Sequence, residues 1–289
     1  MTNSPFTVVD GGLSTALELL GHHSQGLLWT ARLLLDQPEV VVAAHRSFVE
    51  AGAEVVISAS YQASVGGFVQ AGCSPQRARQ LLASTTDLVR QAGAPIVAAS
   101  IGPFGATLGD GSEYHGRYAA SWQQIRQFHR ERIAVLADTG PDLYAIETIP
   151  SSVEAEIILE ELNGAPAWLA FSCSDPGHTC AGEPFDQAVA RLAGAPLLAV
   201  GVNCTDPDYV AALLQHAATA SDRPLLAYPN QGRLWDPIQE CWSGDNTPSL
   251  ADYAAHWVKL GARFIGGCCG IGPDQIRSLV QVRRAYLER

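Results

Sequence analysis

LLAVGVNC (197–204) is an apolar run of strand length that ends in an asparagine and a cysteine. Seven similar runs occur along the chain, and segments with apolar residues spaced three and four apart, the period of a helix, separate them. The eight candidate strands are FTVVD (6–10), EVVISAS (54–60), PIVAASIG (95–102), LYAIE (143–147), AWLAFS (167–172), LLAVGVN (197–203), LLAYP (225–229) and RFIGG (263–267). This alternation predicts an α/β protein with a (β/α)8 TIM barrel.

Two further features of the pattern favour the barrel. The strand runs are almost continuously apolar, as expected of parallel strands that are covered on both faces. No linker, charge block or low-complexity stretch divides the 289 residues, so we expect a single domain over residues 1–289. An open doubly wound sheet is the alternative fold with the same alternation.

In a barrel, functional side chains gather where the carboxyl ends of the strands meet. Several predicted strands of this chain end in polar residues or cysteines. These residues are Asp10, Ser58 and Ser60, Glu147, Asn203 and Cys204, and Cys268 and Cys269. We therefore expect their side chains to face one mouth, even where they lie far apart in the sequence.

The run GGCCG (266–270) places Cys268 and Cys269 side by side, between glycines that let the backbone turn both thiols toward one centre. Together with Cys204 they predict a three-thiolate site, which suits zinc. The remaining cysteines lack paired spacing, so we expect an open site with a position left for substrate. For the adjacent pair, a strained vicinal disulfide, a redox switch and an incidental pairing are the alternatives.

Composition excludes several classes of function. The net charge of −11, with no basic patch, disfavours nucleic-acid binding. No apolar run approaches the roughly 20 residues that span a bilayer, and the N-terminus lacks the features of a signal peptide, so we expect a cytoplasmic protein without a membrane partner. The single lysine, Lys259, falls in a helical pattern, which argues against Schiff-base chemistry. Neither GxGxxG nor GxxxxGK is present.

With these residues in view, the chain resembles the homocysteine S-methyltransferase family from end to end, most of all the stand-alone members that use S-methylmethionine as methyl donor. The motifs that carry the likeness are VDGG (9–12), ASYQAS (59–64), SIGPFGATLGDGSEYHG (100–116), IETIP (146–150), GVNC (201–204), YPNQG (228–232) and GGCCG (266–270). The resemblance implies a barrel that binds one zinc ion and methylates homocysteine to methionine. It implies Cys204, Cys268 and Cys269 as zinc ligands, and Asp10 and Glu147 as the acidic groups for the homocysteine amine.

The residues suit this chemistry. An ordinary thiol has a pKa of about 8.5 and only the thiolate is a good nucleophile, so we expect zinc to ionise the homocysteine sulfur. A sulfonium donor leaves as a neutral thioether and needs no general acid, in keeping with the lack of a histidine at any predicted strand end. His115 and His178 are the histidines that we expect nearest the mouth.

Further substrate contacts rest on weaker signals. Ser60 and the amides of the DGG turn (10–12) are candidates for the substrate carboxylate, and Asn203 is a further candidate for substrate binding. A sulfonium also favours aromatic faces. The aromatic candidates are Trp29, Tyr61, Phe104 and Tyr228.

Alternatives remain at each level. S-methylmethionine is the expected donor and S-adenosylmethionine a poorer substrate. Betaine or a cobalamin–folate system is a less favoured donor, since we expect no room in this chain for extra cofactor modules. The acceptor could instead be another thiol, or a selenol such as selenohomocysteine. Two other functions compete with methyl transfer, namely zinc-assisted hydrolysis, which needs a general base beside the metal, and a non-catalytic zinc or redox-sensing barrel.

Overall fold

Eight parallel strands form a barrel in the computed structural model, which describes residues 4–22, 32–232, 234–236, 241–243 and 249–288. The strands are β1 (Thr7–Val8), β2 (Val55–Ile57), β3 (Ile96–Ile101), β4 (Leu143–Ile149), β5 (Ala167–Phe171), β8 (Val200–Asn203), β9 (Leu225–Tyr228) and β12 (Ala262–Ile265). Their order in the sheet is β1-β12-β9-β8-β5-β4-β3-β2, and a parallel bridge between Val9 and Val55 joins its two edges. The predicted (β/α)8 barrel is confirmed.

Each of the eight predicted runs overlaps one of these strands, but β4 differs at its end. It continues to Ile149, two residues beyond the predicted end at Glu147. Its pairing with β5 shifts register between Ile146 and Ile149, and Thr148 within this segment has a φ of 58°. The irregular segment changes the direction of the chain where β4 reaches the mouth of the barrel.

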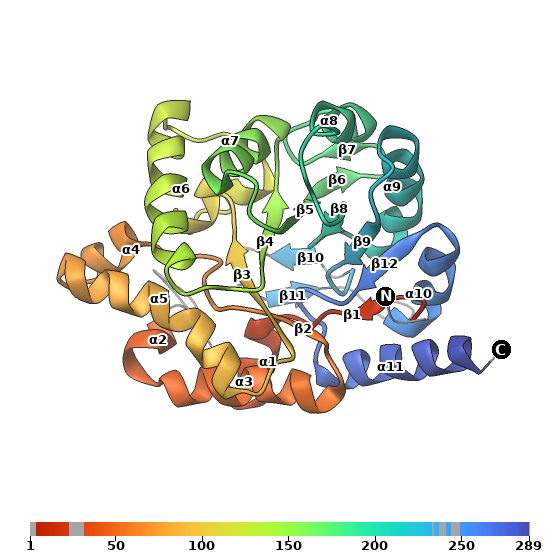
Figure 1. Ribbon diagram of the computed structural model, residues 1–289, viewed down its shortest axis with the longest axis horizontal. Helices are drawn as coiled ribbons and strands as arrows, with labels where there is room; N and C mark the ends of the chain where they lie inside the picture. Colours follow the sequence, from red (N-terminus) through yellow and green to blue (C-terminus); the bar gives the residue numbers. More distant parts are fainter. Residues whose placement is uncertain (1–3, 23–31, 233, 237–240, 244–248, 289) are drawn as a thin grey trace.

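Helices connect the strands and cover the outside of the barrel (Figure 1). They are α1 (Leu13–Leu19), α2 (Leu33–Asp36), α3 (Pro38–Ala51), α4 (Val65–Gln70), α5 (Pro75–Gln91), α6 (Trp122–Ala137), α7 (Ser152–Leu162), α8 (Phe185–Arg191), α9 (Pro207–Ala220), α10 (Leu250–Lys259) and α11 (Pro273–Leu287). Local sequence sets several of their ends. Ser74 caps α5 by accepting a hydrogen bond from the Arg77 N–H, and α3 ends where Gly52 adopts a φ of 99°.

Side chains fill the space on both faces of the strands. Inside the barrel, Trp168 and Tyr228 pack in a buried cluster with small and aliphatic residues such as Ala145 and Leu226. A second, larger cluster lies between the strands and the helices. Burial on both faces explains why the strand runs are continuously apolar. The inner cluster also forms a solid floor beneath the mouth.

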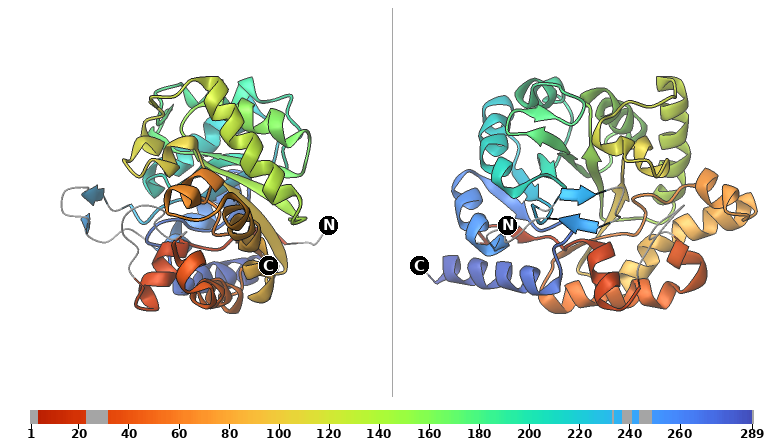
Figure 2. Two further views of the ribbon diagram at one scale, coloured as in Figure 1. Left: turned by 90° about the vertical axis from the view of Figure 1, so that its left-hand side faces the viewer. Right: turned by 180° about the vertical axis from the view of Figure 1, so that it is seen from behind.

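Short elements follow several strands at the carboxyl end of the barrel. They are the hairpins β6–β7 (Cys173–Asp175 and His178–Thr179) and β10–β11 (Leu234–Asp236 and Cys241–Ser243), and the 3-10 turns η2 (Phe104–Thr107) and η3 (Ser112–Tyr114). The β10–β11 hairpin projects from the barrel on the side away from the N-terminus (Figure 2). Loops and turns at this end, rather than the barrel wall alone, therefore shape the mouth.

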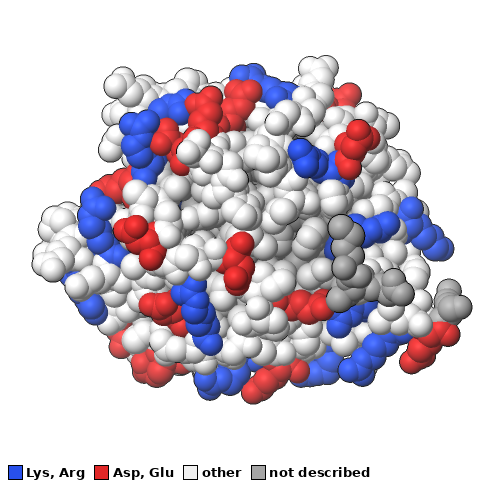
Figure 3. All heavy atoms as spheres, in the orientation of Figure 1, with Lys and Arg blue, Asp and Glu red and all other residues white. Residues whose placement is uncertain are grey.

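Acidic and basic side chains are interspersed on the face drawn in Figure 3, which differs from the continuous basic surface that nucleic-acid binding uses. None of the helices in the described part of the chain is both long enough and apolar enough to cross a membrane.

Candidate metal and substrate site

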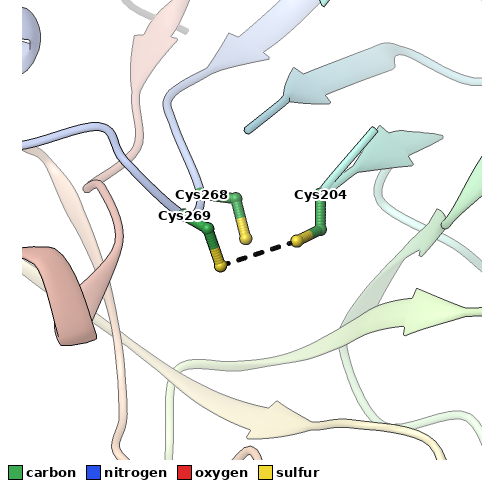
Figure 4. Close-up of side chains that lie close together, drawn as sticks. All are labelled: Cys204, Cys268 and Cys269. Atoms are coloured by element: carbon green, nitrogen blue, oxygen red, sulfur yellow. Dashed lines mark hydrogen bonds between the residues drawn. The ribbon is translucent and has the colours of Figure 1, made fainter. Parts of the chain in front are cut away.

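Three cysteine sulfurs meet at the mouth of the barrel (Figure 4). The Sγ atoms of Cys204, Cys268 and Cys269 all lie within 4.8 Å of one another, and those of Cys204 and Cys269 are 3.7 Å apart. Cys204 follows β8 and the other two follow β12, and only β9 separates these strands in the sheet. The thiols that the sequence places at strand ends thus converge.

Cys204 reaches this point through an unusual backbone conformation. Its φ of 45° lies in the left-handed region, which costs a non-glycine residue roughly 1–3 kcal/mol unless its surroundings impose it. The Cys204 N–H donates to the carbonyl oxygen of Tyr228 at 3.2 Å, and the Thr205 hydroxyl donates to the carbonyl oxygen of Asn203 at 2.9 Å. These bonds hold the chain on both sides of the cysteine.

The loop that carries Cys268 and Cys269 packs too closely for side chains at its glycines. A Cβ on Gly267 would lie 2.1 Å from Cγ2 of Ile271, and one on Gly12 would lie 2.5 Å from the carbonyl oxygen of Cys268. The Cys268 N–H donates to the carbonyl oxygen of Pro229 at 2.7 Å. The segments that follow β1 and β9 therefore fix the position of this loop.

The sulfur arrangement fits a tetrahedral metal site. Zn–S bonds of about 2.3 Å at tetrahedral angles place neighbouring sulfurs roughly 3.8 Å apart, close to the 3.7 Å between Cys204 and Cys269. Hydrogen bonds from Cys268 and Cys269 hold the pKa of Cys204 well below its usual value, whereas hydrogen bonding to Cys204 raises the pKa of the other two thiols. The trio alone thus favours one thiolate, and a bound divalent cation would favour three.

Two carboxylates stand near the sulfurs, at the mouth ends of β1 and β4. Asp10 is buried; its Oδ2 accepts a hydrogen bond from the Ile57 N–H at 2.8 Å, while its Oδ1 has no partner. Glu147 accepts hydrogen bonds from the hydroxyls of Ser100 and Tyr228. Burial raises the pKa of Asp10 well above its usual value and that of Glu147 to about 7. Both groups would therefore gain from a cationic ligand.

Ser60 and Asn203 are fully buried and bond to other strand ends. The Ser60 hydroxyl donates to the carbonyl oxygen of Ser100 at 2.8 Å and lies 2.8 Å from the hydroxyl of Ser58. Asn203 accepts a hydrogen bond from the Thr148 N–H at 2.6 Å, and its amide nitrogen donates to the Thr148 hydroxyl at 2.8 Å. Neither Ser60 nor Asn203 is among the described residues that line the cavity at the mouth.

That cavity has a volume of about 140 Å³ and adjoins the three sulfurs. Asp10 and Glu147 line it, and so does Ser58 at the end of β2. Among the described lining residues there is no lysine, arginine or histidine. A cation entering the cavity would meet acidic groups and no positive side chain in this part of the wall.

The turn η3 contributes two lining residues that sequence reasoning missed, Glu113 and Tyr114. The Tyr114 hydroxyl lies 3.3 Å from the Cys204 Sγ. Glu113 is 7% exposed, its Oε2 is buried without a hydrogen-bond partner, and burial raises its pKa to about 7. Both residues belong to a glycine-rich loop well beyond the end of β3. At that distance from the strand, the sequence does not indicate where their side chains point. The one available signal is a carboxylate beside an aromatic residue inside a motif of the resemblance.

The aromatic candidates divide into two groups. Tyr61 and Tyr228 line the cavity. Phe104 does not line it, and its ring instead packs edge-on against Phe128 with centroids 5.2 Å apart. Trp29 lies outside the described residues.

The two histidines expected near the mouth lie away from the cavity lining. His115 is exposed, and its Nδ1 accepts a hydrogen bond from the Arg117 N–H at 3.0 Å. His178 is exposed as well, and its Nδ1 lies 3.0 Å from Oδ1 of Asp175. Both rings engage neighbours in their own loops.

A buried polar network stands behind one wall of the cavity. Glu154 of α7 accepts hydrogen bonds from His129 Nε2 at 2.9 Å, from the Phe104 N–H at 2.6 Å and from the Tyr118 hydroxyl at 2.9 Å. The Nδ1 of His129 lies 3.0 Å from a guanidinium nitrogen of Arg132. Glu154, His129 and Arg132 are each at most 1% exposed. Burial lowers the pKa of His129 to about 4, so this ring is neutral at pH 7.

Arg132 extends the network to two loops of the mouth. Its guanidinium donates to the carbonyl oxygen of Gly102, which follows β3, and to that of Tyr61, which follows β2, the latter at 3.3 Å. Because Tyr61 lines the cavity, helices α6 and α7 outside the barrel help to position the cavity wall.

A family model described as homocysteine S-methyltransferase matches residues 7–283. The chain belongs to the homocysteine S-methyltransferase family. The homocysteine S-methyltransferase of Escherichia coli (strain K12) is 38% identical, over 94% of this chain and 93% of that protein. The selenocysteine Se-methyltransferase of Brassica oleracea var. italica is 33% identical, over 95% and 88%. The predicted family and enzyme class are confirmed.

A solved structure supports the same assignment. The metallated form of the homocysteine methyltransferase MmuM from Escherichia coli superimposes with a TM-score of 0.84, at 37% identity and with 96% of each chain covered. A structure of that relative thus holds a metal. In this homocysteine S-methyltransferase family member, the three converging cysteines form a group that could bind one.

Proposed function

We propose that this protein binds one zinc ion through Cys204, Cys268 and Cys269 and transfers a methyl group from S-methylmethionine to the thiol of homocysteine, giving methionine. The convergence of three sulfurs within 4.8 Å carries the proposal. Thiolates select soft or borderline metals such as zinc, and three protein ligands leave a position for substrate. We also propose that residues 1–289 form one domain, since β1 and β12, from the two ends of the chain, are neighbours in the barrel.

The metal and the protein have separate tasks. A bound zinc ion would hold the homocysteine sulfur as a thiolate at neutral pH. Asp10 and Glu147 bind the ammonium group of homocysteine, and the partner-free Oδ1 of Asp10 supports this assignment. Ser100 and Tyr228 hold the Glu147 carboxylate in place. Such orientation of reacting groups can contribute roughly 7–11 kcal/mol to lowering a barrier.

The cavity also suits a sulfonium donor. Carboxylates line it and no cationic side chain of the described residues does, so a positively charged donor is attracted. Tyr61 and Tyr228 present aromatic rings, which favour cations. A sulfonium leaves as a neutral thioether, so the reaction proceeds without a general acid. S-adenosylmethionine, which is also a sulfonium amino acid, is the alternative donor.

Ser60 and Asn203 act on substrate indirectly in this proposal. The Ser60 hydroxyl bonds to the Ser100 backbone, and Ser100 in turn bonds to Glu147. Asn203 bonds to Thr148, the residue after Glu147, and itself precedes Cys204. Both side chains therefore position groups that contact substrate or metal.

The relative named selenocysteine Se-methyltransferase supports a selenol as a second class of acceptor. A selenol is more acidic than a thiol, so it needs less help to ionise. Competition between homocysteine, selenohomocysteine and selenocysteine at equal concentrations would rank the acceptors.

The decisive experiment measures methionine formed from homocysteine and S-methylmethionine by zinc-loaded protein, with and without a chelator. Cys268→Ser and Cys204→Ala are expected to lose both zinc and methyl transfer. Cys73→Ser is the matched control, because Cys73 does not line the cavity and is expected to keep both. Full activity of either ligand variant, or of chelated wild type, would refute the assignment.

A further inference from the structure

Glu113 is a buried acid that the proposed chemistry does not yet use. It is 7% exposed and lines the cavity, and its Oε2 is buried without a hydrogen-bond partner. No described basic side chain lines the same cavity. Burying a carboxylate oxygen without a hydrogen-bond partner costs free energy unless a ligand supplies that partner. A cationic ligand in the cavity would supply the missing partner and stabilise the buried carboxylate.

The position of Glu113 separates it from the Asp10 and Glu147 carboxylates. Those two stand at the ends of β1 and β4, and the charge of Glu147 contributes to the raised pKa of Asp10. Glu113 comes from the loop turn η3, and the charges that act on its pKa, after burial, are those of Cys204 and Asp110. The cavity therefore has two acidic regions, one on strand ends and one on the loop.

The loop region borders the place where the methyl group must be transferred. The residue next to Glu113, Tyr114, has its hydroxyl 3.3 Å from the Cys204 Sγ. A donor must bring its methyl carbon to about 3–3.5 Å from the acceptor sulfur. A donor molecule at that distance from a sulfur held beside Cys204 would lie alongside η3.

The charges of the substrates match these two regions. Homocysteine carries one ammonium group, for which Asp10 and Glu147 are already assigned. A sulfonium amino acid carries two positive charges, the ammonium and the sulfonium, and only one is lost on methyl transfer. The ammonium keeps its charge throughout the reaction. A carboxylate that pairs with it therefore stabilises the ground state and the transition state equally and lowers the KM for the donor.

We propose that Glu113 binds the methyl donor through its positive charge and makes the enzyme selective for cationic donors. This inference rests on the proposed function and adds a specificity residue to it. The side chain contacts the donor and takes no part in metal binding or in holding homocysteine.

The test compares Glu113→Gln with wild type, both zinc-loaded, in steady-state kinetics with each substrate varied in turn. The neutral isostere is expected to raise the KM for S-methylmethionine by about 10- to 100-fold, since a bond between charged groups is lost. Zinc content and the KM for homocysteine are expected to stay unchanged. Glu147→Gln is the reciprocal variant and should raise the KM for homocysteine instead. Glu39→Gln, on the exposed side of α3, is the control that should change neither.

A second donor separates the two charges. The (3-carboxypropyl)dimethylsulfonium ion is S-methylmethionine without its amino group. If Glu113→Gln uses it as well as wild type does, Glu113 recognises the ammonium; if the variant is still impaired, Glu113 recognises the sulfonium. Either result supports donor binding by this carboxylate.

An unchanged donor KM in Glu113→Gln, or equal increases for both substrates, would overturn the inference. Glu113→Asp keeps the charge on a shorter arm, and it provides a second measurement if the glutamine variant folds poorly. It is expected to bind the donor more tightly than Glu113→Gln, and equal affinity in the two variants would contradict the proposal. Absence of methionine formation by wild type with any sulfonium donor would instead refute the proposed function.

Discussion

Asn203→Ala tests whether one buried side-chain amide couples Cys204, the proposed metal ligand, to Glu147, the proposed substrate-binding residue. The side chain is fully buried and makes two hydrogen bonds to Thr148, of 2.6 and 2.8 Å. The substitution removes both bonds and leaves the Thr148 N–H buried without a partner. At about 1 kcal/mol for each of the two bonds plus about 1–3 kcal/mol for the stranded donor, the free energy of unfolding should fall by roughly 3–5 kcal/mol.

The effect should extend to function, because Asn203 adjoins Cys204 and Thr148 adjoins Glu147. Both Thr148 and Cys204 have positive φ values, of 58° and 45°, which the surrounding bonds must maintain. We therefore expect weaker zinc binding and a higher homocysteine KM in the same variant. Urea unfolding of the metal-free protein, zinc competition with a chelator, and steady-state kinetics measure the three quantities.

A double-mutant cycle with Thr148→Ala identifies the contact responsible. That variant removes the hydroxyl that bonds to the Asn203 amide and also to the Tyr61 side chain, but it keeps the bond from the Thr148 N–H to Asn203. Part of the loss should therefore be shared between Thr148→Ala and Asn203→Ala, with a coupling energy of about 1 kcal/mol. Additive losses would show that Asn203 acts through other neighbours. A stability within about 0.5 kcal/mol of wild type, with normal zinc affinity, would refute the reasoning altogether.

Three further predictions address the loop, the acid and the supporting network. Gly267→Ala is expected to weaken zinc binding measured by chelator competition, since the new Cβ would lie 2.1 Å from Ile271, whereas Gly66→Ala, with no atom within 4 Å, should not. Glu147, whose pKa is raised from 4.5 to about 7, contributes roughly 3 kcal/mol of stability that is complete below about pH 4.5 and lost as the pH rises through about 7. Glu147→Gln should remove that part of the pH dependence in urea unfolding of metal-free protein. In wild type, homocysteine binding should strengthen as the pH rises through the same range, because the ammonium group pairs with the ionised carboxylate. Arg132→Met should cost about 3–5 kcal/mol in urea unfolding, because it leaves buried polar partners uncompensated, and a loss below about 1 kcal/mol would contradict this role.

The sequence was sufficient for the barrel and for the convergence of the thiols. Continuous apolar runs identify strands buried on both faces, and parallel strands bring the residues after their carboxyl ends to one mouth. Cys204 and the adjacent pair Cys268–Cys269 could therefore be placed together from position alone. The end of β4 could not, because its register shift and the φ of Thr148 arise from contacts with β5 and Asn203.

The sequence did not predict the loop residues Glu113 and Tyr114, for a different reason. Glu113 and Tyr114 arrive at the cavity through a long connection with turns and glycines, whose path depends on tertiary contacts rather than on any local period. Asn203 shows the converse limit. Its place at a strand end was predicted correctly, whereas its side-chain hydrogen bonds to Thr148 depend on β4, which is separated from β8 by β5 in the sheet. Strand-end position indicates where a side chain lies better than it indicates what that side chain touches.

The network of Glu154, His129 and Arg132 has a consequence for the way such an enzyme changes its substrate. The segments after β2 and β3 are both held by Arg132 of α6, which belongs to a buried network with Glu154 of α7. Exchanging one segment alone would therefore leave buried charged groups of this network without their partners. Engineering a new donor preference therefore calls for transplanting the two segments together with α6 and α7 as one cassette. Substitutions on those helices, remote from any reacting atom, become a route to altered selectivity.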